Sequence, residues 1–448
     1  MPSLEESARL AVKRLRDAGH EALWAGGCVR DFLRGVAPKD YDIATSARPG
    51  QVQQLFPGSN AIGAHFGVIL IHLGGNPFEI ATFRSDGSYV DGRHPRSVTF
   101  ATVEEDARRR DFTINGMFHD PLEEITIDLV GGRTDLEGGI LRAIGAPDQR
   151  FGEDYLRMLR AVRFATVLGF RIEPATWEAL RTHAPLITRI SPERIRDELD
   201  RIWLHPRRVL GFDLLADSGL MEAILPELLV LRGCTQPPQW HPEGDVYVHT
   251  RLMLTLLPEE CSLPLVLSVL FHDIAKPATW TFDQENDRIR FNGHDVLGAE
   301  MTELILRRLK YSNDIIEATV TGVANHMNFK DVQKMRTSKV KRMMARPTFP
   351  DELALHRVDC LGSNGLMDNY EFLLAKQQEY HTDSEPLIPP RLITGHDVMK
   401  LGVAPGPEVG ALLQEAQDLQ LEGTLATREQ AEVWLVERLK TPLPAPAS

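Results

Sequence analysis

The sequence predicts a mixed α/β domain at its amino end, followed by regions that are helical. Two observations predict this fold class. Short runs rich in β-branched and aromatic residues alternate with short amphipathic stretches as far as about residue 145. Beyond that point the apolar residues recur with helical spacing. With 448 residues, the chain is long enough for about three domains and a substantial buried core.

The composition is that of an ordinary globular protein, with a net charge of −13. This charge is unfavourable for a nucleic-acid binder, so it predicts either local basic patches or no polyanionic partner. Four scattered cysteines without CxxC spacing predict neither a disulfide framework nor a cysteine-based zinc site, and they fit a reducing cytoplasm. The amino end has an amphipathic helical pattern rather than that of a signal peptide, and no apolar run approaches the ~20 residues of a membrane span.

The stretch from Trp24 to Thr45 carries the first candidate site. It reads as a strand, a turn at Gly26 and Gly27, a short helix, and then Asp40 and Asp42 leading into a second strand. Side chains alternate between the faces of a strand, so the two aspartates are expected to point the same way. Paired carboxylates suit one or two Mg²⁺ ions, and the glycine turn before a helix suits a triphosphate. An ordinary surface turn is the alternative for either fragment alone.

Two strand-like runs follow, at 62–73 and 77–84. Glu79 lies on the second run, which we expect beside the strand of paired aspartates. It is the candidate third carboxylate, either for a metal shell or to help deprotonate an attacking hydroxyl, with an exposed strand residue as the alternative. The polar segment 85–100 is expected to be a functional loop. Arg108–Arg110 predicts contact with a polyanion rather than a role in the fold, because burying unpaired guanidinium groups is costly; a solvated charge run is the alternative.

Five motifs in a fixed order resemble the class II tRNA nucleotidyltransferase and bacterial poly(A) polymerase family. They are GGCVRD, KDYDIAT, FEIATFR, RRRDFTIN and GEDYLRMLRAVRF, and the resemblance covers roughly the first 230 residues closely. It implies an enzyme that extends RNA 3′ ends, with a palm-like head that uses two Mg²⁺ ions. It also implies that Asp40 and Asp42 bind metal and that Glu79 supports them. The nucleotide-contacting residues that it implies in the head are Gly26, Gly27, Arg30, Arg110, Asp111 and Asn115.

The last motif predicts a surface that reads a base. Asp154 and Arg157 are expected at positions i and i+3 of one helix, hence on one face. A carboxylate beside a guanidinium suits the exocyclic amine and ring acceptor of cytosine or adenine, whereas uracil or guanine would leave a charged group unpaired. A surface ion pair is the alternative. The resemblance assigns base selection to Glu153, Asp154 and Arg157, and a bracing role to Glu193 and Arg194.

A second group of candidate residues follows a boundary rich in proline and glycine at 236–244. Its histidines and aspartates gather in one helical region, and their spacing resembles the HD superfamily of metal-dependent phosphohydrolases. The implied metal ligands are His249, His272, Asp273 and Asp359, with His294 and His326 as further ligands or phosphate contacts. An imidazole-rich shell suits a transition metal, with Mg²⁺ or Mn²⁺ as the alternatives. The expected reaction is hydrolysis of phosphomonoester or 2′,3′-cyclic phosphate ends on RNA, and a scaffold without activity is the alternative.

Taken together, the patterns and the resemblances predict four regions. They are a nucleotidyltransferase head at 1–145, a helical neck with the base-selecting helix at 146–235, an HD domain at 240–362 and a helical tail at 363–448. The basic segment Met335–Arg346 predicts an RNA-backbone patch, with a solvated helix face as the alternative.

The predicted function is template-independent addition of CCA, or of its terminal A, to tRNA 3′ ends from CTP and ATP, with release of pyrophosphate. The loop at 85–98 favours the A step, because relatives that add only CC tend to lack it. A poly(A) polymerase is the runner-up, but the segment that carries a basic pair before Phe in that group reads Ala64-His65-Phe66 here. The remaining alternatives are an HD phosphohydrolase with an RNA-binding head and a non-enzymatic RNA-binding protein. The expected partners are a tRNA or other RNA 3′ end, CTP and ATP, without a membrane.

Overall fold

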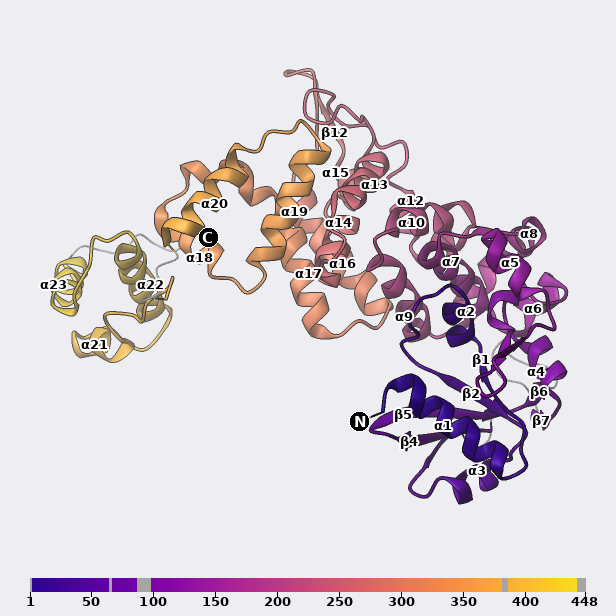
Figure 1. The fold of residues 1–448 in the computed structure, drawn as a ribbon. Helices are drawn as coiled ribbons and strands as arrows, with labels where there is room; N and C mark the ends of the chain where they lie inside the picture. The colour runs from indigo at the N-terminus through magenta and orange to yellow at the C-terminus, as the bar shows by residue number, and fades with distance from the viewer. Residues whose placement is uncertain (1, 64–66, 87–97, 381–385, 441–448) are drawn as a thin grey trace. The chain divides into compact units, whose positions relative to one another are not determined.

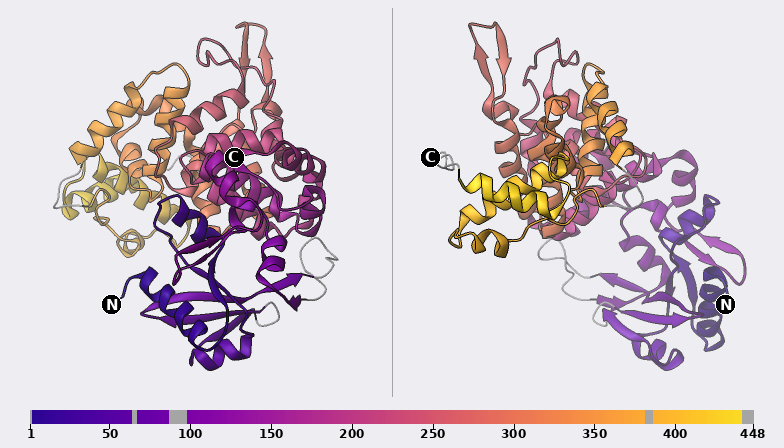
Figure 2. Two further views of the ribbon diagram at one scale, coloured as in Figure 1. Left: turned by 45° about the vertical axis from the view of Figure 1, so that its right-hand side comes forward. Right: turned by 90° about the vertical axis from the view of Figure 1, so that its left-hand side faces the viewer.

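The computed structural model describes residues 2–63, 67–86, 98–380 and 386–440. These residues form two compact units (Figures 1 and 2). The first unit comprises Met1–Val230, Pro258–Glu260 and Ile305–Tyr311, and the second comprises Leu231–Leu257, Cys261–Leu304 and Ser312–Ser448. The predicted fold class is confirmed, because a mixed sheet near the amino end is followed by a long succession of helices.

A seven-stranded sheet organises the amino-terminal part of the first unit, with the strand order β3-β4-β5-β2-β1-β8-β9. Its strands are β1 (Ala22–Ala25), β2 (Asp42–Thr45), β3 (Asn60–Gly63), β4 (Val68–Leu73), β5 (Asn76–Thr82), β8 (Phe118–Asp120) and β9 (Ile125–Ile127). Neighbouring strands are antiparallel except β2 and β5, which are parallel. In the parallel register, residues 43–45 of β2 lie opposite residues 80–82 of β5, so the start of β2 lies beside the middle of β5.

Helix α1 (Leu4–Asp17) covers part of this sheet with the apolar face that the sequence predicts. A capping box begins the helix, since Ser3 accepts from the backbone N–H of Glu6 and Glu6 accepts from that of Ser3. The other short elements of the head are α2 (Gly27–Leu33), α3 (Pro49–Leu55), β6 (Arg84–Asp86), β7 (Val98–Phe100), α4 (Val103–Arg109), η2 (Thr113–Asn115) and α5 (Gly132–Gly138).

Helices make up most of the rest of the first unit. They are α6 (Pro147–Glu153), α7 (Leu156–Leu168), α8 (Pro174–His183), η3 (Ala184–Arg189), α9 (Pro192–Trp203), α10 (Arg208–Asp217), α11 (Leu220–Ile224) and α12 (Pro226–Leu229). Helix α7 is buried on almost every side and packs against α9 and α10. A short parallel pair, β10 (Ile140–Leu141) and β11 (Arg171–Ile172), departs from the helical prediction.

The second unit is helical apart from one hairpin among its described residues. Its helices are α13 (Val246–Leu256), α14 (Leu263–Phe271), α15 (Lys276–Thr279), α16 (His294–Arg308, whose last turn belongs to the first unit), α17 (Asn313–Asn325), η4 (His326–Lys334), α18 (Thr337–Met344), α19 (Phe349–Gly362), α20 (Asp368–Tyr380), α21 (Gly395–Lys400), α22 (Pro407–Leu421) and α23 (Arg428–Leu439). The hairpin joins β12 (Thr281–Asp283) to β13 (Arg288–Arg290), and the helical prediction overlooked it. None of the helices in the described ranges has the length and apolar character needed to span a membrane.

Candidate functional site

Three carboxylates meet where β2 and β5 run side by side. Asp42 begins β2, Asp40 lies two residues before it, and Glu79 lies on β5. The parallel register of the two strands places Glu79 next to Asp42. All three side chains are exposed, whereas Tyr41 and Ile43 are buried on the other face. The predicted alternation of faces and the predicted pairing of the two strands are therefore confirmed.

The electrostatics of this triad favour a bound cation. Although Asp42 is accessible at the surface, nearby protein atoms remove part of the hydration of its carboxylate, and the negative charges of Asp40 and Glu79 add to this effect. Together they raise the pKa of Asp42 to about 6. A divalent cation among the three oxygens would relieve this repulsion, and carboxylate oxygens are the ligands that Mg²⁺ prefers.

In metal-free protein, Asp42→Asn is expected to increase stability at pH 8 and to have little effect at pH 4. The folded state raises the pKa of Asp42 from 3.8 to about 6, so the ionised carboxylate costs folding free energy. This cost is absent below about pH 4, grows as the pH rises to 6, and is complete above it. Thermal unfolding in EDTA at pH 4, 6 and 8 measures the effect, with Asp17→Asn on α1 as the exposed control. A stability difference that is constant across this range would contradict the prediction.

The turn between β1 and α2 lies against an arginine and an asparagine. Gly26 has a φ of +76°, and a Cβ at this position would lie 3.0 Å from Nη1 of Arg110. Arg30 donates to the side-chain oxygen of Asn115 at 2.8 Å, and Arg110 donates to the carbonyl oxygen of Asn115 at 3.4 Å. Gly27 is the first residue of α2. The residues predicted to hold the triphosphate and sugar thus lie in one connected group.

Two of the three consecutive arginines also support the fold. Arg109 and Arg110 form ion pairs with Asp106 at 2.6 and 2.9 Å, and the Asp106 side chain is only 2% exposed. Although burial opposes ionisation, the two arginines lower the pKa of Asp106 below its usual value. The prediction that this run has no role in the fold was wrong, because guanidinium groups that share a buried carboxylate are not unpaired.

Asp111 lies at the centre of a buried network. Although burial alone would raise its pKa, an ion pair with Arg160 at 2.5 Å and a hydrogen bond from Asn115 at 3.2 Å lower the pKa to about 2. A third interaction is the backbone N–H of Phe112, which donates to Asp111 at 2.8 Å. Asp111 therefore fixes Asn115 relative to α7, which carries Arg160. Sequence reasoning did not identify Arg160 or this link.

Asp154 lies between α6 and α7 and not on a helix. Its backbone is extended, with φ −142° and ψ 107°. The prediction that Asp154 and Arg157 occupy one helix was wrong, because the helical conformation is interrupted at Asp154, between α6 and α7. They remain close, since the backbone N–H of Arg157 donates to the carbonyl of Asp154 at 3.0 Å. The acid paired with Arg157 is Glu153, while Asp154 accepts from Arg194 at 3.2 Å, in line with the bracing role predicted for Arg194.

A further buried ion pair joins α7 to α9. It is formed by Arg163 and Glu198. Arg157, Arg160 and Arg163 recur every three residues along α7, and each has an acidic partner. This spacing was visible in the sequence and was the signal that could have identified the pairs.

The second candidate site gathers four histidines and two aspartates within the second unit. His249 comes from α13, His272 and Asp273 follow α14, His294 begins α16, His326 begins η4, and Asp359 comes from α19. The potential ligand atoms of His249, His272 and Asp273 lie within 4.8 Å of one another, and so do those of Asp273, His294 and His326. Because Asp273 belongs to both sets, the geometry suits two cations that share one carboxylate.

Hydrogen bonding prepares three of these histidines for metal binding. The Nδ1 atoms of His272, His294 and His326 each lie 2.6–3.0 Å from the carbonyl oxygen three residues earlier. This arrangement places the proton on Nδ1 and leaves Nε2 as the ligand atom. The Nε2 atoms of His294 and His326 are 3.1 Å apart. Unprotonated nitrogens repel at that distance, whereas ligands about 2.0–2.1 Å from one ion are separated by roughly 3 Å. The donor set therefore fits a divalent cation.

His249 is held by two carboxylates. Its Nδ1 lies 2.7 Å from Glu243 and 3.3 Å from the Gly362 carbonyl, and its Nε2 lies 3.1 Å from Asp359. Burial opposes protonation, but the two carboxylates raise the pKa of His249 to about 9. His241 contacts Glu243 in turn at 2.9 Å. Sequence reasoning missed Glu243 and His241, because the segment that contains them was interpreted only as a domain boundary.

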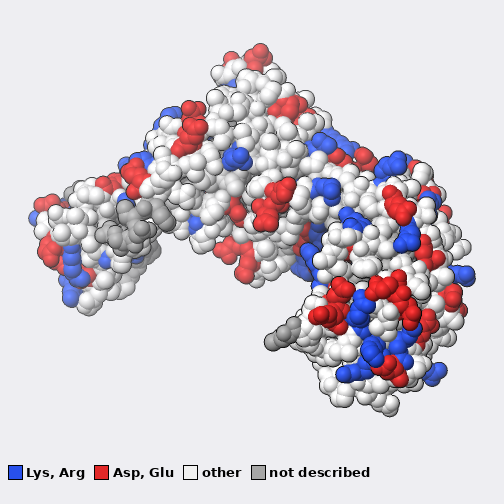
Figure 3. Space-filling model, viewed as in Figure 1, with Lys and Arg blue, Asp and Glu red and all other residues white. Residues whose placement is uncertain are grey.

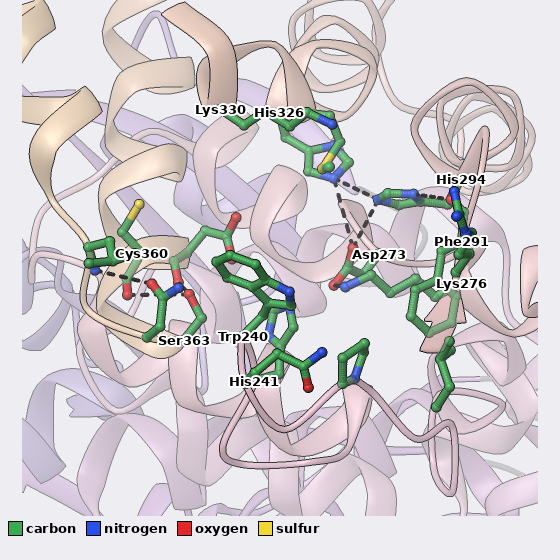
Figure 4. Close-up of a pocket in the computed structure, with 18 of the residues that line it drawn as sticks. Trp240, His241, Asp273, Lys276, Phe291, His294, His326, Lys330, Cys360 and Ser363 are labelled. Atoms are coloured by element: carbon green, nitrogen blue, oxygen red, sulfur yellow. Dashed lines mark hydrogen bonds and ion pairs between the residues drawn. The ribbon is translucent and has the colours of Figure 1, made fainter. Parts of the chain in front are cut away.

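The histidine and aspartate cluster opens onto a cavity of about 740 Å³ (Figure 4). Asp273, His294, His326 and Asp359 contribute to its lining. Lys276 lies 2.6 Å from Asp273 and, together with the neighbouring histidines, keeps the pKa of Asp273 well below its usual range despite burial. Lys276 was not among the site residues predicted from the sequence.

The basic segment 335–346 uses much of its charge internally. On α18, Arg342 pairs with Asp418 at 2.8 Å and Lys341 donates to the Leu421 carbonyl at 3.1 Å. Beyond the end of this helix, Arg346 pairs with Glu352 at 2.5 Å. These contacts leave less charge for RNA than the sequence predicts. On the face shown in Figure 3, acidic and basic side chains are mixed over the first unit.

Two motifs used in the sequence analysis lie outside the described residues. They are the Ala64-His65-Phe66 segment and most of the loop at 85–98.

Family models match three segments of the chain. The Poly A polymerase head domain matches residues 22–142, the "Probable RNA and SrmB-binding site of polymerase A" matches residues 169–231, and the HD domain matches residues 246–359.

Two relatives illustrate the similarity in sequence. A CCA-adding enzyme of Lactobacillus gasseri is 31% identical over 437 residues, which are 96% of this chain and 96% of the relative. A CCA-adding enzyme of Geobacillus kaustophilus is 44% identical over 224 residues, which are 50% of this chain and 55% of the relative.

Solved structures show the same similarity. The Bacillus stearothermophilus CCA-adding enzyme in complex with CTP matches with a TM-score of 0.75 and 25% identity, over 98% of both chains. The Thermotoga maritima CCA-adding enzyme complexed with tRNA_CCA shares the fold, with a TM-score of 0.60 and 20% identity over 98% of this chain and 96% of that one.

Proposed function

Since this chain belongs to the CCA-adding enzyme family, we propose that it adds CCA, or its terminal A, to tRNA 3′ ends from CTP and ATP and releases pyrophosphate. The observation that carries the proposal is the carboxylate triad of Asp40, Asp42 and Glu79 beside the arginine-lined glycine turn. The similar proteins described above are CCA-adding enzymes, which favours this function over poly(A) synthesis.

In this proposal Asp40 and Asp42 would hold two Mg²⁺ ions, which would supply positive charge to offset the negative charge that develops when the tRNA 3′-hydroxyl attacks the α-phosphate. Glu79 supports the two aspartates. The remaining nucleotide contacts are assigned to Gly26, Gly27, Arg30, Arg110, Asp111 and Asn115. Asp111 acts through its hydrogen bond to Asn115, because its carboxylate is already occupied by Arg160.

The proposed base reader comprises Glu153, Asp154 and Arg157. Arg194 orients the Asp154 carboxylate, and Glu153 orients the Arg157 guanidinium. One oxygen of the Asp154 carboxylate accepts from Arg194, and the other accepts from the backbone N–H of Leu156. A bound base would therefore donate to an oxygen that already accepts one hydrogen bond from the protein. The protein itself, with no template, would then choose the base.

Asp154→Ala is expected to lower the preference for CTP over UTP, and for ATP over GTP, by about tenfold to a hundredfold. The reason is that the variant loses the acceptor that faces the exocyclic amine. Single-turnover incorporation of each nucleotide measures the preference. Asp197→Ala on α9, where the acid is largely exposed, is the control. A rate loss of equal size for all four nucleotides would contradict a role in base choice.

The overall proposal is tested with tRNAs that lack A, CA or CCA, each incubated with CTP, ATP or both. Full CCA addition predicts that all three tRNAs reach the same final length when both nucleotides are present. Growth of only the tRNA that lacks A would restrict the activity to the terminal step. Long A tails would instead support the poly(A) alternative.

We also propose that the second unit hydrolyses phosphomonoester or 2′,3′-cyclic phosphate ends on RNA. The supporting observation is the set of imidazole Nε2 atoms around Asp273. His249, His272, Asp273 and Asp359 would hold a divalent cation, with His294 and His326 completing the position for a second one. Their nitrogen donors favour a transition metal over Mg²⁺. A bound cation would supply an activated water, and Glu243 would orient the His249 ring.

We retain the proposed division into a head (1–145), a neck (146–235), an HD domain (240–362) and a tail (363–448). Nucleotide addition would belong to the head and neck, and hydrolysis to the HD domain. We also propose that the protein is located in a reducing cytoplasm.

A further inference from the structure

The cavity beside the histidine cluster is larger than a phosphate group requires. Its volume of about 740 Å³ lies in the range of pockets that enclose a whole small-molecule ligand, roughly 300–1,000 Å³. The candidate metal ligands supply only part of its lining. The remaining lining is therefore available to the part of the substrate that carries the phosphate.

One of these lining residues is Trp240, and its indole is unusually open. The residue is 55% exposed, and among the described residues no aromatic ring or cation packs on it. In Figure 4 the indole lies in the cavity between Asp273 on one side and Cys360 and Ser363 on the other. An uncovered aromatic face inside a ligand-sized cavity offers a surface on which a nucleobase can stack.

The loop that carries Trp240 is anchored to the histidine cluster. Lys276 contacts Asp273 at 2.6 Å and donates to Gln236 at 2.6 Å, and Gln236 is only 2% exposed. The backbone N–H of Trp240 donates in turn to the Pro237 carbonyl at 3.1 Å. Next to Trp240, the ring of His241 packs edge-on against His249 with centroids 4.8 Å apart. The position of the indole is therefore coupled to that of the proposed metal ligands.

The same cavity supplies positive charge for phosphate. Lys330 and Arg288 line it, and no acidic side chain in the described ranges forms an ion pair with either. Arg290, by contrast, is neutralised by Asp283. The lining thus combines an aromatic platform, two cations and the proposed metal ligands, which are complementary to a base, a phosphate and a scissile phosphoester.

We propose that Trp240 stacks on the base of a nucleoside 2′- or 3′-phosphate, either free or at an RNA end, and so makes the hydrolase selective for phosphoesters that carry a base. This inference rests on the proposed hydrolase. In the reaction, a water oxygen forms a bond to phosphorus, the bond from phosphorus to the ribose oxygen breaks, and that oxygen leaves as a hydroxyl after taking a proton. The products are inorganic phosphate and the nucleoside, or, for an RNA end, inorganic phosphate and the RNA with a free terminal hydroxyl.

Binding is measured by calorimetry of the full chain in EDTA with adenosine 3′-monophosphate. Trp240→Ala is expected to weaken binding by about tenfold to a hundredfold, and Trp240→Phe to restore most of it. Trp280→Ala is the matched control, because Trp280 is 43% exposed in the same unit and does not line the cavity. All variants retain the same head and its nucleotide binding, so a difference in affinity between variants arises from the cavity. Equal affinity in wild type and Trp240→Ala would overturn the proposal.

Hydrolysis by metal-loaded protein supplies the second readout. For adenosine 3′-monophosphate, Trp240→Ala is expected to lower kcat/KM by the same factor as its affinity, while kcat/KM for glycerol 2-phosphate stays within twofold. A short oligoribonucleotide with a 3′-phosphate shows whether an RNA end is used as well as a free nucleotide. Equal losses on both small substrates would overturn the stacking role. If wild type hydrolyses neither while the binding difference persists, the hydrolase fails and the base subsite stands.

Discussion

Asp42→Ala is expected to reduce nucleotide incorporation by at least about a thousandfold while the protein remains folded. Asp42 is the one member of the triad that begins β2, and Asp40 and Glu79 flank it. Removing it takes away a ligand of the proposed metal clamp, which stabilises transition-state charge by several kcal/mol, and each 1.36 kcal/mol corresponds to a factor of ten. Incorporation of labelled ATP into tRNA lacking its terminal A, under single-turnover conditions, measures the loss.

The same variant distinguishes the two proposed sites. Phosphoester hydrolysis by Asp42→Ala is expected to equal that of wild type, because the second cluster uses residues of the other unit. Asp17→Ala on α1 removes an exposed carboxylate and should leave incorporation unchanged. Incorporation within tenfold of wild type would show that Asp42 is not a metal ligand for the reaction.

The double variant His272→Ala/Asp273→Asn is expected to reduce phosphoester hydrolysis by about a thousandfold and to lower the bound metal content. Asp273 belongs to both candidate ligand sets, so its loss disrupts both at once. Nucleotide incorporation should persist. Hydrolysis of a 2′,3′-cyclic phosphate, together with metal analysis of the purified protein, measures the effect.

A second His-Asp pair in the same unit provides a matched control. His396 and Asp397 lie on α21, outside the candidate cluster, and the side-chain oxygen introduced by Asp397→Asn can still accept from the backbone N–H of Thr394 in the capping box. His396→Ala/Asp397→Asn should therefore retain both hydrolysis and metal. If the variant at 272 and 273 hydrolyses phosphoesters at the wild-type rate, the HD region is a scaffold.

Local sequence patterns predicted those features that depend on neighbouring residues. The outward placement of Asp40 and Asp42 follows from the two-residue period of a strand, and the helix before the sheet follows from its apolar spacing. The pairing of β2 with the strand of Glu79 was also predicted correctly. In the second unit, the His and Asp residues singled out from the sequence lie together in three dimensions.

Features that depend on distant partners or on a single break in the chain were not predicted. Asp154 falls in a gap between two helices, and nothing in the local apolar pattern marks that gap. Glu243 acquires its position only when its loop meets α13. Arg109 and Arg110 were interpreted as polyanion contacts without a role in the fold, because their buried acceptor Asp106 was not recognised.

The three-residue spacing of arginines along α7 has a consequence for protein engineering. Each arginine has its acid elsewhere: Glu153 at the end of α6, Asp111 in the head and Glu198 on α9. A chimaera that takes only α7 from another protein would leave these acids without their arginine partners. Grafts that aim to alter nucleotide preference should therefore transfer α7 together with its acidic partners as one cassette.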